Sequence, residues 1–424
     1  MTSQDLPSQN LARHDLTSKV STPELEQRKI SACLAVICVF AATATLATNI
    51  FLPSLPSMAA TLHVSSAAVT SAITVYLAVF AVGQLIVGPL SDRFGRRPPI
   101  LIGLCLFVAG TIWCALADDL ANLLIGRSIQ ASGACAASVL ARAIARDLFD
   151  GLMLAKVMAM ITIATAAAPG FSPLLGGALD HFLGWRSEFI FVAAFAIGAV
   201  AAYAAFVGET IRSARTSMNP RTIAGSYLAL IRDAGFIVPA RTSGLLMVGL
   251  FAIFSGAPRV LLEDFEFSPI TLGLLFAGVV FVVFGAGMLA PGLSARLGLY
   301  RATMVGLGTT VVGSIALLLA VLVAKDSFPP FLAAIAIFLF GVGIASPLSN
   351  TAALSPFGNK AGVAAALLGF SQMAGGAIGA LLAAAVSSDP ALGLGIVLSL
   401  ASPLALIQYG LGERPTWAEP AAAA

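Results

Sequence analysis

Few side chains in the long apolar stretches of this chain could carry chemistry, and Asn49 is the first of them. It stands in the segment ATLATNIFLPSLPSM, inside an apolar run that begins at Ser31. If that run lies in lipid, the amide needs a partner, because hydrocarbon offers no hydrogen bonds. An amide donates and accepts hydrogen bonds but does not exchange a proton at physiological pH. Asn49 can thus bind a substrate or a neighbouring helix, but it cannot carry a proton.

Arg127 is the one charged residue that lies inside an apolar run away from its ends, and Gln130 follows three residues later on the same helix face. Burying a guanidinium without partners is costly, so such residues usually face an interior cavity. The alternative is a structural arginine that bonds to backbone carbonyls.

Five further polar positions could line a pathway for a substrate. Four of them lie within apolar runs, and each could equally form an ordinary interhelical hydrogen bond, worth about 0.6 kcal/mol: Tyr76, Gln84, Asn350 and Gln372. The fifth, Arg259, lies near the end of a run and can snorkel to the membrane surface; a role in substrate entry is the other interpretation.

No acidic residue or histidine lies in the middle of an apolar run. All 20 Asp and Glu and all 3 His fall in tails, in connecting segments or at the ends of runs. We therefore expect no metal site, no cofactor and no catalytic constellation, which argues against a membrane-embedded enzyme. A sensor would usually carry a soluble output domain, and none is visible.

Composition determines which elements must position these residues. Of the 424 residues, 58% are hydrophobic and only 10% are charged, with a mean hydropathy of +0.96. A soluble protein has about 25% charged residues. A transmembrane helix needs about 20 apolar residues, and the runs are long and continuous, so helices are favoured over barrel strands. The sequence therefore predicts an all-α integral membrane protein in a lipid bilayer.

We expect about twelve spans, which would place both termini on the same side of the membrane. They are predicted at 31–52, 68–90, 98–117, 120–141, 155–179, 188–207, 241–261, 270–293, 301–323, 329–349, 361–386 and 391–411. Most of the 23 Lys and Arg residues flank the spans on the side of the termini; Arg186, Arg259 and Lys325 lie on the other. Cytoplasmic loops are rich in these residues, so we expect both termini in the cytoplasm. The net charge of +3 reflects this topology and indicates no nucleic-acid partner.

The chain divides into two similar halves. LSDRFGRR at 90–97 matches LSARLGLYR at 293–301, and GFSPLLGG at 170–177 matches GFSQMAGG at 369–376. We predict a disordered tail at 1–30, a six-helix bundle at 31–207, a central cytoplasmic loop at 208–240, a second six-helix bundle at 241–411 and a tail at 412–424. Repeated bundles of this kind are typical of transporters, whose substrate site lies between the repeats.

The segment GQLIVGPLSDRFGRRPP at 83–99 joins the second and third predicted spans. Its glycines permit a tight turn, and its charged residues can anchor the loop or pair with one another. A simple positively charged loop is the alternative. We take as a conformational-switch loop Gly88, Asp92, Arg93, Gly95, Arg96 and Arg97, with Arg142 and Arg146 from the end of the fourth span.

The fifth predicted span contains the segment PGFSPLLGG. Small residues allow close helix packing, and proline removes a helical hydrogen bond. The candidate residues are Pro169, Gly170, Pro173, Gly176 and Gly177. Close packing alone would account for their spacing.

Several of these segments resemble motifs of one family. GPLSDRFGRRP closely resembles the signature loop of the major facilitator superfamily. GRSIQASGACAASVLARAIARD at 126–147 and APGFSPLLGG at 168–177 resemble the fourth-span and fifth-span motifs of its drug:proton antiporters. NIFLPSLPSMAATL at 49–62, together with RAIARD, is similar to the Bcr/CflA group of bacterial drug exporters. GAPRVLLEDFEFS at 256–268 weakly resembles a stretch of phenicol exporters.

The resemblance implies a major facilitator fold in the bacterial inner membrane and a transporter that works as a monomer. It implies that Arg127 takes part in proton coupling, that Gln130 contacts the substrate and that the fifth-span motif seals the halves. It also implies export of small, largely apolar or amphipathic compounds in exchange for protons. Relatives in this group usually carry Asp where this chain has Asn49, so a metabolite exporter or facilitated carrier with altered or absent proton coupling is the alternative.

Overall fold

The computed structural model describes residues 22–149, 151–206, 220–324, 327–387 and 389–412, and within these ranges it consists of helices and short connections without a strand. The first half contains α1 (Thr22–Asn49), α2 (Leu55–Thr61), α3 (Ser66–Phe94), α4 (Arg97–Ala115), α5 (Leu120–Leu148), α6 (Gly151–Leu183) and α7 (Arg186–Phe206). After α8 (Pro220–Arg232) come α9 (Ala234–Arg259), α10 (Pro269–Leu297), α11 (Leu299–Val323), α12 (Phe328–Leu354), α13 (Ala361–Ala385) and α14 (Pro390–Leu411). Short 3₁₀ or π segments are η1 (Leu52–Ser54), η2 (Val260–Asp264) and η3 (Ser355–Lys360).

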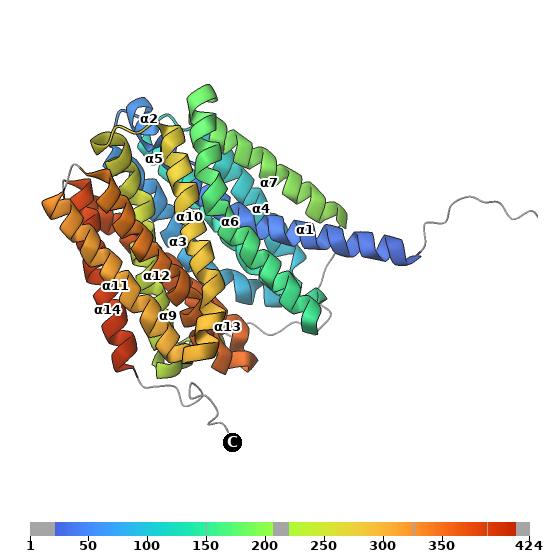
Figure 1. The fold of residues 1–424 in the computed structure, drawn as a ribbon. Coiled ribbons are helices and arrows are strands. Elements are labelled where there is room, and N and C mark those ends of the chain that lie inside the picture. The colour runs from blue at the N-terminus through green and yellow to red at the C-terminus, as the bar shows by residue number, and fades with distance from the viewer. Residues whose placement is uncertain (1–21, 150, 207–219, 325–326, 388, 413–424) are drawn as a thin grey trace, which may run out of the picture.

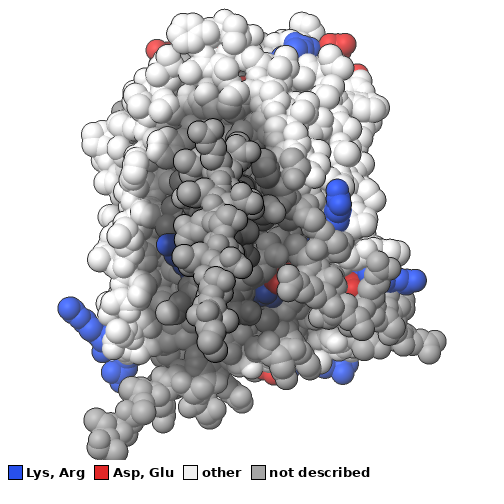
Figure 2. Space-filling view, turned by 90° about the vertical axis from the view of Figure 1, so that its right-hand side faces the viewer, with Lys and Arg blue, Asp and Glu red and all other residues white. Residues whose placement is uncertain are grey.

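The helices have the length and composition of membrane spans. Within the described residues, 11 helices are long and apolar enough to cross a bilayer, and α6 adds a helix of 33 residues. Many large apolar side chains on their outward faces are exposed, for example Val312, Leu319 and Ile407. Figure 2 shows that most of the described surface on one face carries no Lys, Arg, Asp or Glu. The prediction of an all-α multi-pass membrane protein is confirmed.

Two predicted boundaries were wrong. The tail was predicted to be disordered up to residue 30, but α1 already begins at Thr22. The central loop was predicted for 208–240, but it contains α8 and the first turns of α9. The physical reason is that α8 is amphipathic and buries Leu230 against the bundle. Residues 1–21, 207–219 and 413–424 lie outside the described residues.

The predicted internal repeat has a structural counterpart at the ends of α3 and α10. Gly95 follows α3 with φ 92° and ψ 168°, and Gly298 follows α10 with φ 80° and ψ 155°. Each glycine N–H donates to the carbonyl of a serine four residues earlier, at 3.0 Å to Ser91 and 2.9 Å to Ser294. A positive φ of this size favours glycine. The two glycines therefore make the same turn at matching places in the two halves.

The halves contact each other mainly along α3 with α13 and α6 with α10. We call the side of the bundle where α3 and α14 end the basic side, because it carries Arg93, Arg96 and Arg97. In Figure 1 it is the lower side, and α6 and α10 lie together at the top and diverge toward it. At the other side η1 contacts both α9 and α10. The halves are thus packed together at that side.

Candidate functional site

The centre of the first half is organised around Arg127 on α5, whose side chain is completely buried. One terminal nitrogen, Nη1, donates to the Ala47 carbonyl at 2.9 Å and to Gln130 Oε1 at 2.6 Å. Nε makes a long contact of 3.5 Å with the Ala72 carbonyl. Ala47 lies in the last turn of α1, where carbonyls lack helical partners and a cation is favoured. Arg127 therefore ties α5 to the end of α1.

Two aromatic rings enclose the same guanidinium. Its central carbon lies 4.3 Å from the ring centroid of Tyr76 and 4.5 Å from that of Phe51. Tyr76 is itself fixed, because its hydroxyl donates to the Ala44 carbonyl at 3.1 Å. The faces of these rings attract a desolvated cation and replace part of the stabilisation that hydration would give the charge. Within the described residues, Nη2 of Arg127 has no hydrogen-bond partner.

Gln130 extends this cluster to α4. Its Nε2 donates to the Thr111 hydroxyl at 2.9 Å, and that hydroxyl donates to the Phe107 carbonyl at 2.6 Å. The structure thus brings together three predicted residues, Tyr76, Arg127 and Gln130. It adds Phe51 and Thr111, which a single sequence does not distinguish from ordinary core residues of a span.

Asn49 is the last residue of α1, and only 2% of it is exposed. Its Nδ2 donates to the Thr45 carbonyl at 2.8 Å, which is a bond within its own helix. Its Oδ1 is buried and has no partner among the described residues. A buried acceptor without a donor is unfavourable. Asn49 therefore offers one free hydrogen-bond acceptor inside the first half. Within the described residues, neither a cationic nor an acidic side chain bonds to the Asn49 amide.

The second half has its own polar cluster, formed by α9, α12 and α13. The Ser243 hydroxyl donates to Asn350 Oδ1 at 2.8 Å, and Gln372 Nε2 lies 2.9 Å from Ser243 Oγ and 3.0 Å from Asn350 Oδ1. Asn350 and Gln372, predicted separately, therefore meet. Ser243 was missed, because serines are frequent in spans and most bond to their own helix.

Two other predicted residues lie apart from both clusters. Gln84 on α3 is buried against α13, where a Cβ on Gly369 would overlap its side-chain oxygen. It therefore lies between the halves. Arg259 is the last residue of α9 and is only partly buried.

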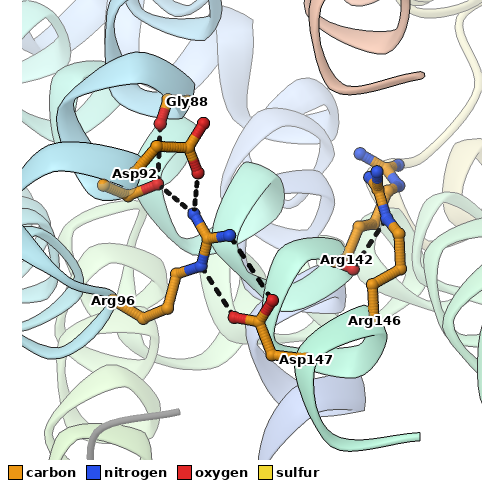
Figure 3. Close-up of polar contacts among 7 residues, drawn as sticks. Gly88, Asp92, Arg96, Arg142, Arg146 and Asp147 are labelled. Carbon is orange, nitrogen blue, oxygen red and sulfur yellow. Dashed lines mark hydrogen bonds and ion pairs between the residues drawn. The ribbon is translucent and has the colours of Figure 1, made fainter. Parts of the chain in front are cut away.

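The predicted switch loop forms a charge network on the basic side, shown in Figure 3. Arg96 donates to Asp147 Oδ2 at 2.8 Å, to Asp92 Oδ1 at 2.5 Å and to Ser91 Oγ at 2.6 Å. Burial alone would lower the pKa of Arg96, but its bonds to Asp147 and Asp92 raise that pKa above its ordinary value. Arg96 thus fastens the α3–α4 turn to the end of α5. Asp147 was missed as a site residue because it was placed in a loop.

The other residues of the predicted switch stand beside this network. Arg93 and Arg97 are exposed, and Gly88 has open space beside it. Arg146 Nε donates to the Arg142 carbonyl at 3.3 Å, and in Figure 3 both guanidinium groups point away from Asp147. Gly88, Asp92, Arg96, Arg142 and Arg146 line a cavity of about 420 Å³, which Tyr227 of α8 and Gly362 and Ala366 of α13 complete.

The fifth-span motif lies in α6, which contains Pro169 and Pro173 in its interior. A Cβ on Gly176 would overlap the Ile50 carbonyl oxygen, so glycine is needed for the approach of α6 to the end of α1. Gly170 faces Val280 of α10, and Gly177 is buried. From the other side, a Cβ on Gly273 of α10 would crowd the backbone of Leu174. The motif therefore packs α6 against both halves.

The described residues contain no group of three or more His, Cys, Asp or Glu that could hold a metal ion. The arrangement offers hydrogen bonds, a buried cation and apolar walls. Such a site can bind and orient a small molecule.

Comparison with known proteins identifies the family. Residues 37–380 match the model of the Major Facilitator Superfamily. The chain belongs to the major facilitator superfamily. Its twelve-helix architecture in two six-helix halves is the fold that the resemblance implied.

Curated proteins from several bacteria are similar to this chain over most of its length. The chain is 31% identical over 336 residues to the uncharacterized MFS-type transporter YdgK of Bacillus subtilis, covering 78% of this chain and 83% of the relative. It is 29% identical to multidrug resistance protein D of Escherichia coli, covering 88% and 93%, and 29% identical to a chloramphenicol resistance protein of Pseudomonas aeruginosa, covering 82% and 79%. Among solved structures, the human organic anion transporter MFSD10 matches with a TM-score of 0.64 at 21% identity, over 90% of this chain and 99% of that chain. This last match supports the fold.

Proposed function

We propose that this major facilitator exports small, largely apolar or amphipathic compounds by alternating access, in exchange for protons. The relatives named for multidrug and chloramphenicol resistance support the substrate class. The observation that carries the proposal is the pair of polar clusters, one around Arg127 and one around Gln372, on the two halves of the bundle. Transporters of this architecture bind substrate between their repeats.

The proposal includes an orientation. The basic side is taken as cytoplasmic, because Lys and Arg gather there, and the opposite side is then the outer side of the bacterial inner membrane. The cavity beside Arg142 and Arg146 would open toward the cytoplasm, and the contacts of η1 with α9 and α10 would close the outer side. The structure then represents an inward-facing exporter, ready to take up a substrate as a monomer.

In this proposal Arg127 takes part in proton coupling and Gln130 contacts the substrate, and both residues belong to the first half. The unpartnered Nη2 of Arg127 and Oδ1 of Asn49 are a donor and an acceptor that a substrate could use. Gln372 and Asn350 would supply polar contacts from the second half. The Arg96 network would hold the α3–α4 turn while the halves move, and the glycines of α6 would let α6 and α10 seal the outer side.

A facilitated carrier without proton coupling is the second candidate, and Asn49 favours it. Within the described residues, no acidic group forms an ion pair with Arg127 or a hydrogen bond with Asn49. If proton coupling needs an acid at this place, the chain lacks it.

Drug accumulation in an efflux-deficient bacterial host tests export. Cells that express the protein should accumulate less of a fluorescent amphipathic dye, and less chloramphenicol, than cells that express an Arg127→Ala variant at equal membrane levels. Equal accumulation across a broad panel of compounds would contradict export. Dissipating the proton gradient separates the two candidates, because only the antiporter loses export when the gradient collapses.

A further inference from the structure

A second buried charged residue lies far from Arg127, at the junction of α6 and α7. Glu188, in the first turn of α7, is completely buried. It is the only acidic residue among the buried residues of the described chain. Sequence alone placed it with the acids of the outer face, where water would solvate it.

The carboxyl group of Glu188 is only half satisfied. The Ser54 hydroxyl donates a hydrogen bond to Oε1, while Oε2 is buried and has no partner within the described residues. An ionised carboxylate would carry negative charge on this bare oxygen, which is strongly unfavourable away from water. A neutral carboxylic acid leaves only one unused O–H there.

Within the part of the chain that the structure describes, no cation compensates a charge on Glu188. Asp180 of α6 is the one described charged group that acts electrostatically on Glu188, and it is itself acidic. Neither η1 nor α2 contains a charged residue, and the charges of α1 and α4 lie at the far ends of those helices. His181, next to Asp180, is exposed and packs on Phe182. Arg186, two residues before Glu188, is engaged with Asp118 at 3.1 Å.

Glu188 and Asp180 hold the segment that closes the outer side. Ser57, three residues after Ser54, lies 2.9 Å and 2.8 Å from the two oxygens of Asp180. Two serine–carboxyl bonds therefore fasten η1 and α2 to the α6–α7 junction. The segment η1 also contacts α9 and α10 of the second half. When the halves separate at this side, water gains access to η1 and to the carboxyl group behind it.

We propose that Glu188 is a proton-binding site that takes up a proton from the outer side and that its neutral form allows the outer side to close. In this step one proton passes from hydronium to Oε2 and forms the neutral acid. When the outer side opens, the O–H bond breaks and the proton returns to water. An acidic outer medium would therefore drive the empty exporter back to the state that faces the cytoplasm. The inference rests on the proposed function and its orientation, and it adds to them a control of the exporter's conformation by the outer pH.

The test measures the opening of the outer side without any substrate. Spin labels on exposed Ala60 of α2 and Val323 of α11, in the full chain with its native cysteines replaced, report the distance across that side. In lipid nanodiscs across about pH 5 to 9, the parent should change from a short to a long distance as pH rises. Glu188→Gln, a permanently neutral isostere, should keep the short distance throughout. An unchanged pH response in Glu188→Gln, or no response in the parent, would overturn the proposal.

Ser54→Ala provides a second variant in case Glu188→Gln does not fold. The Ser54 hydroxyl stabilises the ionised carboxylate more than the neutral acid, because bonds to charged acceptors are stronger. Its loss should move the pH midpoint of opening upward, by up to about one pH unit. If Ser54 only held the structure together, its loss would change the proportions of open and closed protein at every pH and leave the pH midpoint of opening unchanged. That result would count against a proton site. Since no substrate is present in this test, its result does not depend on whether the protein exports drugs.

Discussion

The enclosure of Arg127 predicts that a lysine at this position is more damaging than a methionine. Lysine keeps the positive charge, but its single ammonium group cannot reach the Ala47 carbonyl, Gln130 Oε1 and both aromatic rings together. Methionine loses these contacts and also removes the buried charge. We therefore expect the folded stability to fall in the order wild type, Arg127→Met, Arg127→Lys.

The size of the effect follows from the contacts. A hydrogen bond to a charged group is worth about 1.5–3 kcal/mol, and a desolvated cation–π contact about 2 kcal/mol. Losing one of each places Arg127→Lys about 3.5–5 kcal/mol below wild type, with its charge still buried. Arg127→Met leaves the Ala47 carbonyl and Gln130 Oε1 without a donor, at about 1–3 kcal/mol each, and regains the desolvation cost of the charge, which is several kcal/mol.

Thermal unfolding of the purified variants in one detergent measures this order. Arg127→Met should unfold close to wild type and Arg127→Lys clearly below it, while both lose export if the guanidinium responds to substrate or proton. A Lys variant as stable as wild type would refute the reasoning from the contacts. A Met variant that exports normally would refute a role for Arg127 in transport.

Three further predictions concern the other parts of the site. Gly176→Ala should lower the melting temperature, because overpacking against Ile50 costs about 1–3 kcal/mol of folding stability. The control Gly285→Ala, where a Cβ meets open space, should leave the melting temperature unchanged or raise it. Equal effects of the two substitutions would contradict the close approach of α6 to Ile50. Asp147→Asn should impair export more than Asp92→Asn, because the Asp147 side chain is 20% exposed and that of Asp92 52%; the reverse order, measured by dye accumulation, would argue against the network. Asn49→Asp should make export more dependent on pH, and an unchanged pH profile would weaken the coupling argument.

The sequence predicts most of the fold because the signals of membrane spans are strong. Long apolar runs, the bias of the charged residues and the repeated motifs locate the spans. The motif around Gly95 also predicts the turn at that glycine. The polar ends of the helices were predicted less well. Amphipathic α8 and the first turns of α9 are stabilised by packing and end effects that a hydropathy pattern does not register.

The site was predicted in part, for a related reason. A charge or an amide in an apolar run is conspicuous, so Arg127, Gln130 and Gln372 could be found from the sequence. Their partners Phe51, Thr111 and Ser243 have side chains that are common in any span. Glu188 was misjudged, because a carboxylate near a helix end is usually solvated, and only the three-dimensional packing of η1 over it shows that it is buried.

Transport by the purified protein in liposomes with an imposed pH gradient tests the central claim most directly. With the lumen acidic and the outside neutral, the proposed antiporter should accumulate a fluorescent amphipathic substrate in the lumen against its gradient, and a proton ionophore should abolish the accumulation. Arg127→Ala protein reconstituted in the same way is the matched control. Substrate that merely equilibrates across the membrane, at a rate indifferent to the gradient, would contradict proton-driven export and identify the protein as a facilitated carrier.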